Sequence, residues 1–139
     1  MPDAAQLAEL SRLAEAAAHR AYAPYSRFFV GAAILLESGE IVTGCNVENA
    51  SYRLTCCAEQ SAIARAVTEF GPAIRIRALV VANLNNTACQ PCGACRQTIA
   101  EFAPPHAIIV YPGQSGEAIT TTLAEILPGA FQLNTVQDS

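Results

Sequence analysis

The chain has 139 residues, a net charge of −4 and 52% hydrophobic residues. These values fit a single folded domain, 1–139, and exclude a disordered chain. All eight cationic residues are arginines, and no lysine is present. Schiff-base chemistry and a Walker-type phosphate loop both need lysine and are therefore excluded. The acidic balance, without any basic run, disfavours nucleic acid as a partner.

No apolar run reaches the roughly 20 residues that a membrane span needs, so we expect no membrane association. The first 22 residues carry Asp3, Glu9 and Glu15 in an amphipathic pattern. They lack the basic start and apolar block of a signal peptide, which leads us to expect a cytoplasmic protein. In that setting, six cysteines indicate metal binding or catalysis rather than disulfides.

Hydrophobic periodicity predicts a helix and a hairpin in the first third of the chain. Leucines and alanines at helical spacing predict an amphipathic helix over 4–21, which the sequence Ala-Pro-Tyr-Ser then breaks. Two strand-like runs follow, Phe28–Leu36 and Glu40–Val47, joined by a turn at Ser38-Gly39.

The remaining segments alternate between helix and strand. Thr55 is the predicted cap of a helix that runs to Phe70. The apolar run 76–83 predicts a strand buried on both faces. Further elements are expected as a helix over 92–102, a strand over 106–112, a weaker strand over 118–121 and a short helix over 123–127. This order predicts an α/β fold with helices on both faces of one mixed sheet.

Three cysteines lie at the starts of two predicted helices. Cys92 and Cys95 are three residues apart, so their sulfurs share a helix face and can bind one ion. The helix N-terminus stabilises both thiolates. A third thiolate from Cys57 would complete the three-ligand arrangement of a catalytic zinc, which keeps one position open. Glu59 would then accept a proton from the activated water.

Other interpretations of the cysteines stay open at this point. The C-x-x-C pair alone is also a dithiol redox motif. A closed structural zinc site would take Cys89, Cys56 or Cys45 as its fourth ligand. An iron–sulfur run is incomplete, because Ile99 stands where its fourth cysteine is needed.

The cysteine pattern matches zinc deaminases, which place a metal ligand two residues before a glutamate and follow it with P-C-x-x-C. Cys57-Ala58-Glu59 and the segment 91–95 fit this pattern. Four stretches in the same order resemble a short-chain cytidine deaminase from about Ala21 to Phe131: AYAPYSRFFVGAA, GCNVENASY, PCGACRQ and LPGAF.

The resemblance implies hydrolytic deamination of cytidine and 2′-deoxycytidine to the uridines with release of ammonia. It also implies a three-layer α/β/α sandwich with a five-stranded mixed sheet, and a homotetramer with shared active sites. One Zn²⁺ per subunit would be held by Cys57, Cys92 and Cys95. Glu59 would act first as base and then as acid, and the Ala58 backbone N–H would bind the O2 carbonyl of the pyrimidine.

The resemblance also implies substrate-binding residues. Asn46 and Glu48 match the pair that binds the sugar 3′-hydroxyl, and Phe28 matches the aromatic residue that packs against the pyrimidine. The positions through which neighbouring subunits complete each other's pocket are matched by Ala50, Tyr52 and Phe131.

The chain departs from this family pattern beside the catalytic glutamate. Three thiolates exceed the charge of Zn²⁺, and the all-cysteine form usually has an arginine at the position of Gln60. We expect Arg53, Arg96 or the two helix dipoles to offset the excess charge. A deaminase of N4-substituted cytosine nucleosides and a non-catalytic zinc-bearing interaction module remain as alternatives; the presence of Glu59 opposes the second.

Overall fold

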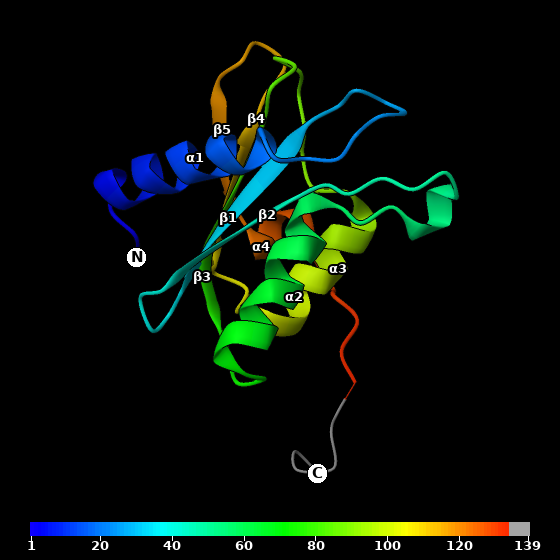
Figure 1. Cartoon of the computed structure of the whole chain (residues 1–139). Helices are drawn as coiled ribbons and strands as arrows, with labels where there is room; N and C mark the ends of the chain where they lie inside the picture. Colours follow the sequence, from blue (N-terminus) through cyan, green and yellow to red (C-terminus); the bar gives the residue numbers. More distant parts are fainter. Residues whose placement is uncertain (134–139) are drawn as a thin grey trace.

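The computed structural model describes residues 1–133 and shows one sheet with helices on both faces (Figure 1). The five strands lie in the order β2-β1-β3-β4-β5. The β3–β4 pair is parallel and the other neighbouring pairs are antiparallel, so the predicted mixed sheet is confirmed. The strands are β1 (Val30–Leu36), β2 (Ile41–Cys45), β3 (Ile76–Asn83), β4 (Ile108–Pro112) and β5 (Ala118–Thr122).

The helices form the outer two layers of the sandwich. On one face, α1 (Ala4–Ala18) packs against the sheet; on the other lie α2 (Ala58–Phe70), α3 (Gly93–Phe102) and the short α4 (Leu123–Ile126). A single 3₁₀ turn, η1 (Tyr52–Leu54), lies in the long loop between β2 and α2, which extends away from the sheet (Figure 1). The three-layer α/β/α fold is therefore confirmed.

Strand β1 shows why a continuous apolar run suits the centre of this sheet. All seven of its residues are buried. Ala32 and Ile34 belong to the core under α2, while Ala33 and Leu35 belong to the core under α1. Successive side chains of a strand point to opposite faces, so a strand covered on both sides needs apolar residues throughout.

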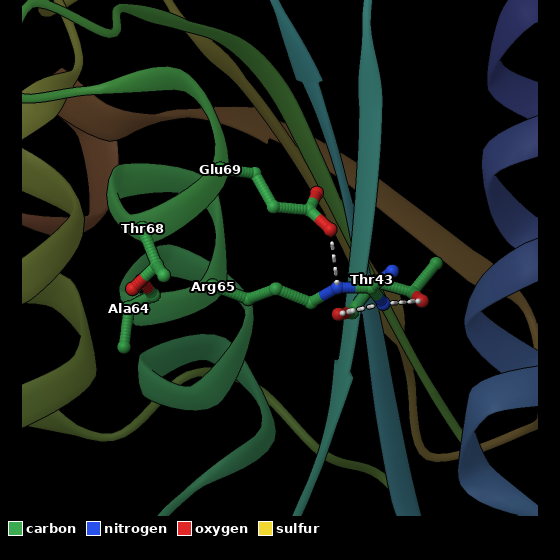
Figure 2. Close-up of polar contacts among 5 residues, drawn as sticks. All are labelled: Thr43, Ala64, Arg65, Thr68 and Glu69. Carbon is green, nitrogen blue, oxygen red and sulfur yellow. Dashed lines mark hydrogen bonds and ion pairs between the residues drawn. The ribbon is translucent and has the colours of Figure 1, made fainter.

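A polar contact on the protein surface connects α2 to β2 (Figure 2). The Arg65 guanidinium donates from Nη1 to the carbonyl and the hydroxyl oxygen of Thr43, both at 3.3 Å. It also forms an ion pair with Glu69, one turn further along the helix, at 3.5 Å. The α2 helix is thus held to an edge strand at its middle, away from the end that begins at Cys57.

Element boundaries differ from the predicted ones where the chain makes isolated bridges. Cys56 is bridged to Val47, with backbone hydrogen bonds of 2.8 and 2.9 Å. This pairing keeps the chain extended, so α2 begins at Ala58 with Cys57 as N-cap, and the predicted Thr55 cap is wrong. Helix α1 ends at Ala18 rather than at residue 21, because Tyr22 is bridged to the same Val47.

Within residues 1–133, no helix is long and apolar enough to cross a membrane.

Candidate active site

Helices α2 and α3 each begin at a cysteine. Cys57 is the N-cap of α2 and Cys92 is the N-cap of α3, and neither side chain makes a capping hydrogen bond. Cys95 lies one turn further into α3 and is 1% exposed. The three sulfur atoms all lie within 4.8 Å of one another. Because a helix N-terminus carries partial positive charge, both helices favour thiolates at this point.

This donor set fits a zinc ion of the catalytic type. Soft thiolates select zinc among the common divalent ions, and three protein ligands leave one tetrahedral position open. In the part of the chain that the structure describes, the metal-ligating group contains Cys57, Cys92 and Cys95 and no fourth side chain. A closed four-cysteine site would have to recruit Cys89, Cys56 or Cys45, which the structure leaves outside the group.

The protonation of the thiols follows from their contacts. A hydrogen bond from Cys95 lowers the pKa of Cys57 to about 7, against the opposing effect of burial. The pKa of Cys95 is raised because its thiol is the partner in that bond. Burial raises the pKa of Cys89 to about 11, so Cys89 stays a neutral thiol at pH 7. Of these thiols, Cys57 therefore ionises most readily.

Glu59 is a buried carboxylic acid at the same pocket. It lies in the first turn of α2 and is 5% exposed. Burial raises its pKa, because the charged form loses its contact with water. A carboxyl group tuned in this way suits proton transfer in both directions near neutral pH.

One cavity of about 240 Å³ brings most of the predicted site residues together. Its walls come from the segment before β1, the segment after β2 and the starts of α2 and α3. The lining residues are Ser26, Phe28, Val30, Asn46, Glu48, Thr55, Cys57, Ala58, Glu59, Gln90, Cys92 and Cys95.

Asn46 and Glu48 already bind the backbone beside the cavity. The Asn46 side chain is buried; it accepts from the Val30 N–H at 2.9 Å and donates to the Phe28 carbonyl at 2.8 Å. The Glu48 carboxylate accepts from the backbone N–H groups of Tyr25 and Ser26 and from the Ser26 hydroxyl. The Ser26 hydroxyl bond lowers the pKa of Glu48, so this side chain is an anion at neutral pH.

Gln60, which replaces the usual arginine, and the two arginines expected to offset the thiolate charge are placed differently from one another. Gln60 donates from Nε2 to the Cys95 sulfur at 3.7 Å. Arg96 donates to the carbonyls of Pro91 and Ile126 and to Gln90; it therefore fixes the loop before Cys92 rather than touching a sulfur. Arg53 is exposed in η1, and within residues 1–133 it has no side-chain hydrogen bond or ion pair.

Three of the predicted substrate-binding residues lie outside the cavity of this chain. Ala50, Tyr52 and Phe131 are all exposed, Tyr52 at 83% and Phe131 at 69%. Sequence reasoning did not select Ser26 and Gln90, which do line the cavity.

Residues 4–111 match the family model described as the cytidine and deoxycytidylate deaminase zinc-binding region. The cytidine deaminase of Halalkalibacterium halodurans is 43% identical over 118 residues, which cover 85% of this chain and 88% of that protein. These matches place the chain in the zinc-dependent cytidine deaminase family. Zn²⁺ is accordingly its cofactor, and the three-thiol cluster provides a suitable site for it.

Solved structures agree with this assignment. The cytidine deaminase of Mycobacterium tuberculosis superposes with a TM-score of 0.80 at 40% identity, over 91% of this chain and 98% of that one. The cytidine deaminase from Burkholderia pseudomallei gives 0.81 at 40% identity, over 89% of this chain and 98% of that one.

Proposed function

We propose that this protein hydrolyses cytidine and 2′-deoxycytidine to uridine and 2′-deoxyuridine, releasing ammonia. The observation that carries the proposal is a single cavity in which a buried carboxylic acid, three clustered thiols and the residues of the predicted sugar and base sites meet. The relatives named above support the substrate class. We assign the reaction to pyrimidine salvage in the cytoplasm, within one domain, 1–139.

In the proposed reaction, Glu59 moves the protons. Zinc held by Cys57, Cys92 and Cys95 would supply an activated water as the nucleophile at neutral pH. Glu59 takes the proton of this water and passes it to N3 of the pyrimidine as C4 is attacked. The same carboxylate then moves the proton of the new C4 hydroxyl to the exocyclic amine, so that the C4 carbonyl forms and ammonia leaves. The raised pKa of Glu59 suits both roles.

The other cavity residues hold the nucleoside. The Ala58 N–H lies in the first turn of α2, where N–H groups have no partner within the helix, and it would bind the O2 carbonyl. Phe28 would pack against the pyrimidine ring. Asn46 and Glu48 would bind the sugar 3′-hydroxyl through the N–H and the oxygen lone pairs that their backbone contacts leave available.

We further propose a homotetramer with shared active sites. The cavity of one chain, at about 240 Å³, is below the roughly 300–1,000 Å³ typical of ligand pockets. Tyr52 and Phe131 are exposed, and so is Ala50, close to Tyr52 in the sequence. Exposed aromatic side chains of this kind commonly mark subunit contacts. A neighbouring subunit would complete the pocket with them.

Turnover of the purified, zinc-loaded protein tests the proposal. Cytidine, deoxycytidine, CMP and an N4-acyl cytidine are compared side by side; formation of the uracil product is measured for all four, and ammonia release for the three with a free amine. We expect rapid release from the two free nucleosides. Glu59→Gln keeps the side-chain shape but carries no exchangeable acid, so its rate should fall by about 10²–10⁴-fold with the zinc content unchanged.

The other outcomes separate the alternatives. Activity on the N4-acyl compound alone would indicate a deaminase of modified cytosines and contradict the main proposal. A protein that binds zinc but is silent on every compound would fit the interaction module. A Glu59→Gln variant as active as the natural chain would remove Glu59 from the mechanism.

A further inference from the structure

Residues 27–30, here called the Phe28 segment, form one wall of the cavity without belonging to a strand for most of their length. Strand β1 begins only at Val30. Phe28 and Val30 line the cavity. The backbone polar groups of Arg27 and Phe29 instead bond to the residues that follow β3. Because only Val30 belongs to a strand, contacts outside the regular sheet must hold the rest of the segment in place.

Asn46 holds one edge of the Phe28 segment. The last β1–β2 pair is Gly31 with Cys45. Just beyond it, the backbone N–H of Asn46 donates to the Val30 carbonyl at 3.1 Å. Its side chain then accepts from the Val30 N–H and donates to the Phe28 carbonyl. The side-chain amide thus stands in for a peptide group of β2 and extends the ladder by one step.

Asn85 holds the opposite edge in the same manner. Beyond the last β1–β3 pair, Val30 with Asn83, the Leu84 N–H donates to the Phe29 carbonyl at 3.0 Å. The Asn85 side chain then accepts from the Phe29 N–H at 3.1 Å and donates to the Arg27 carbonyl at 2.9 Å. Two asparagine amides therefore clamp the segment from both sides.

The clamp holds a backbone conformation that the chain would otherwise leave. Arg27 has a φ of 60°, in the left-handed region that costs non-glycine residues energy. Its carbonyl is the group to which Asn85 donates. The loop that carries Asn85 is itself ordered by Asn83, whose side-chain oxygen accepts from the N–H of Asn85 at 2.9 Å.

We propose that Asn85 is a positioning residue for nucleoside binding: through the backbone of Arg27 and Phe29, it holds the Phe28 ring at the cavity wall. This inference rests on the proposed function, since it assigns Asn85 a part in the affinity for the pyrimidine. Asn85 itself is exposed and does not line the cavity. It acts on the substrate only through the Phe28 segment.

Amide hydrogen exchange, measured by NMR without any nucleoside, tests the clamp on its own. Asn85→Ala removes the acceptor, and exchange of the Phe29 N–H should accelerate by about ten-fold or more, while the β1 amides keep their rates. Asn85→Asp keeps an acceptor for that N–H, so Phe29 should exchange within about three-fold of the natural rate. Unchanged Phe29 exchange in Asn85→Ala would overturn the proposal.

Steady-state kinetics and uridine binding test the consequence for the site. Asn85→Ala should raise KM for cytidine and Kd for uridine by about five-fold or more, with kcat within about two-fold and zinc content unchanged. Arg65→Ala, which removes the hydrogen bonds of α2 to Thr43 away from the cavity, is the control for a general loss of stability and should change none of these. Faster Phe29 exchange with unchanged KM and Kd would overturn the positioning role.

Failure of the proposed function gives a different result. If the natural protein neither releases ammonia from cytidine nor binds uridine, that function is wrong. The exchange data then judge the clamp alone: acceleration at Phe29 supports it and unchanged exchange overturns it.

Discussion

Gln60 gives the thiol cluster a neutral hydrogen-bond donor where a cation would offset more charge. Its Nε2 lies 3.7 Å from the Cys95 sulfur. Three thiolates exceed the charge of Zn²⁺ by one unit, so the groups around the sulfurs decide how well the excess is tolerated. We expect the uncharged amide, together with the starts of α2 and α3, to provide that compensation.

A negative charge at position 60 should therefore weaken zinc retention, and a positive charge should strengthen it. Gln60→Glu adds a carboxylate beside the thiolates, and we expect zinc loss to a chelator to accelerate by about ten-fold. Gln60→Arg supplies a charge-assisted donor and should slow that loss. Zinc release is followed with a colorimetric chelator. Equal release from both variants would show that the side chain does not act on the cluster.

The sequence identified the chemistry-bearing residues better than their supporting contacts. The spacing of Cys92 and Cys95 on one helix face predicted that they bind the same ion, and the structure groups them with Cys57. Spacing did not locate Arg53, which lies exposed in η1. It also gave no sign of Asn85, because a clamp between residues 56 positions apart depends on the register of β1 and β3.

Two glycines let helices approach the sheet closely on its opposite faces. A Cβ on Gly44 in β2 would collide with the Ala62 N–H nitrogen and lie 2.8 Å from the Ala58 carbonyl of α2. A Cβ on Gly31 in β1 would collide with the Ala14 carbonyl and lie 2.6 Å from the Ala18 nitrogen of α1. All four of these helix atoms belong to the backbone, so they cannot rotate away from an added Cβ.

The variants Gly44→Ala and Gly31→Ala form a matched pair that distinguishes an effect on stability from an effect on the metal site. Both variants should lose about 3 kcal/mol or more of unfolding free energy, because overpacking against backbone displaces a whole helix. Gly44→Ala moves the start of α2, which carries Cys57, and should also lower zinc content. Gly31→Ala moves α1 and should leave zinc content unchanged. Denaturant titration and metal analysis check both; equal zinc loss in the two variants contradicts the assignment.

The contact between α2 and β2 predicts unequal effects from its two polar partners (Figure 2). Arg65→Ala removes both hydrogen bonds to Thr43 and should cost about 1 kcal/mol of unfolding free energy. Glu69→Ala removes only an exposed ion pair and should cost less than about 0.5 kcal/mol. Urea denaturation of the two variants measures the difference. A larger loss in Glu69→Ala would mean that the ion pair, and not the Thr43 contact, holds the helix.

Element types followed from periodicity, while several boundaries depended on long-range pairing. The run 76–83 coincides with β3, because a strand buried on both faces has no polar positions to obscure it. The start of α2 could not be read locally. Thr55 is a good capping residue in isolation, but the bridge between Cys56 and Val47 keeps the chain extended past it.

Several large apolar side chains remain uncovered on the described chain. Tyr52, Leu54 and Phe131 are 83%, 67% and 69% exposed. Tyr22 and Val47, which are bridged to each other, are also exposed. A monomer rarely leaves so many aromatic side chains in water without a partner. A symmetric assembly would cover them with equivalent surfaces of other copies.

The proposed sharing of active sites makes a specific prediction for mixed assemblies. We expect a mass of about 58 kDa in solution, four chains of 14.6 kDa, as closed symmetry allows. Glu59→Gln and Phe131→Ala should each be weakly active alone. Refolded together, they should recover part of the natural rate, since some sites then combine an intact Glu59 with an intact Phe131 from another subunit. Light scattering and turnover measure both effects; no recovery on mixing would argue for independent sites.

Helices α2 and α3 both begin at cysteines of the same cluster, and β3 lies between them in the sequence. An ion bound at this cluster would cross-link the two helix starts and close the chain between them, which includes the central strand β3, into a loop. Cross-links of this kind restrict the unfolded chain and raise the free energy of unfolding, in proportion to how tightly the ion is held. We therefore expect the ion that serves the chemistry also to raise the melting temperature, and a substitution that weakens metal binding to lower the free energy of unfolding.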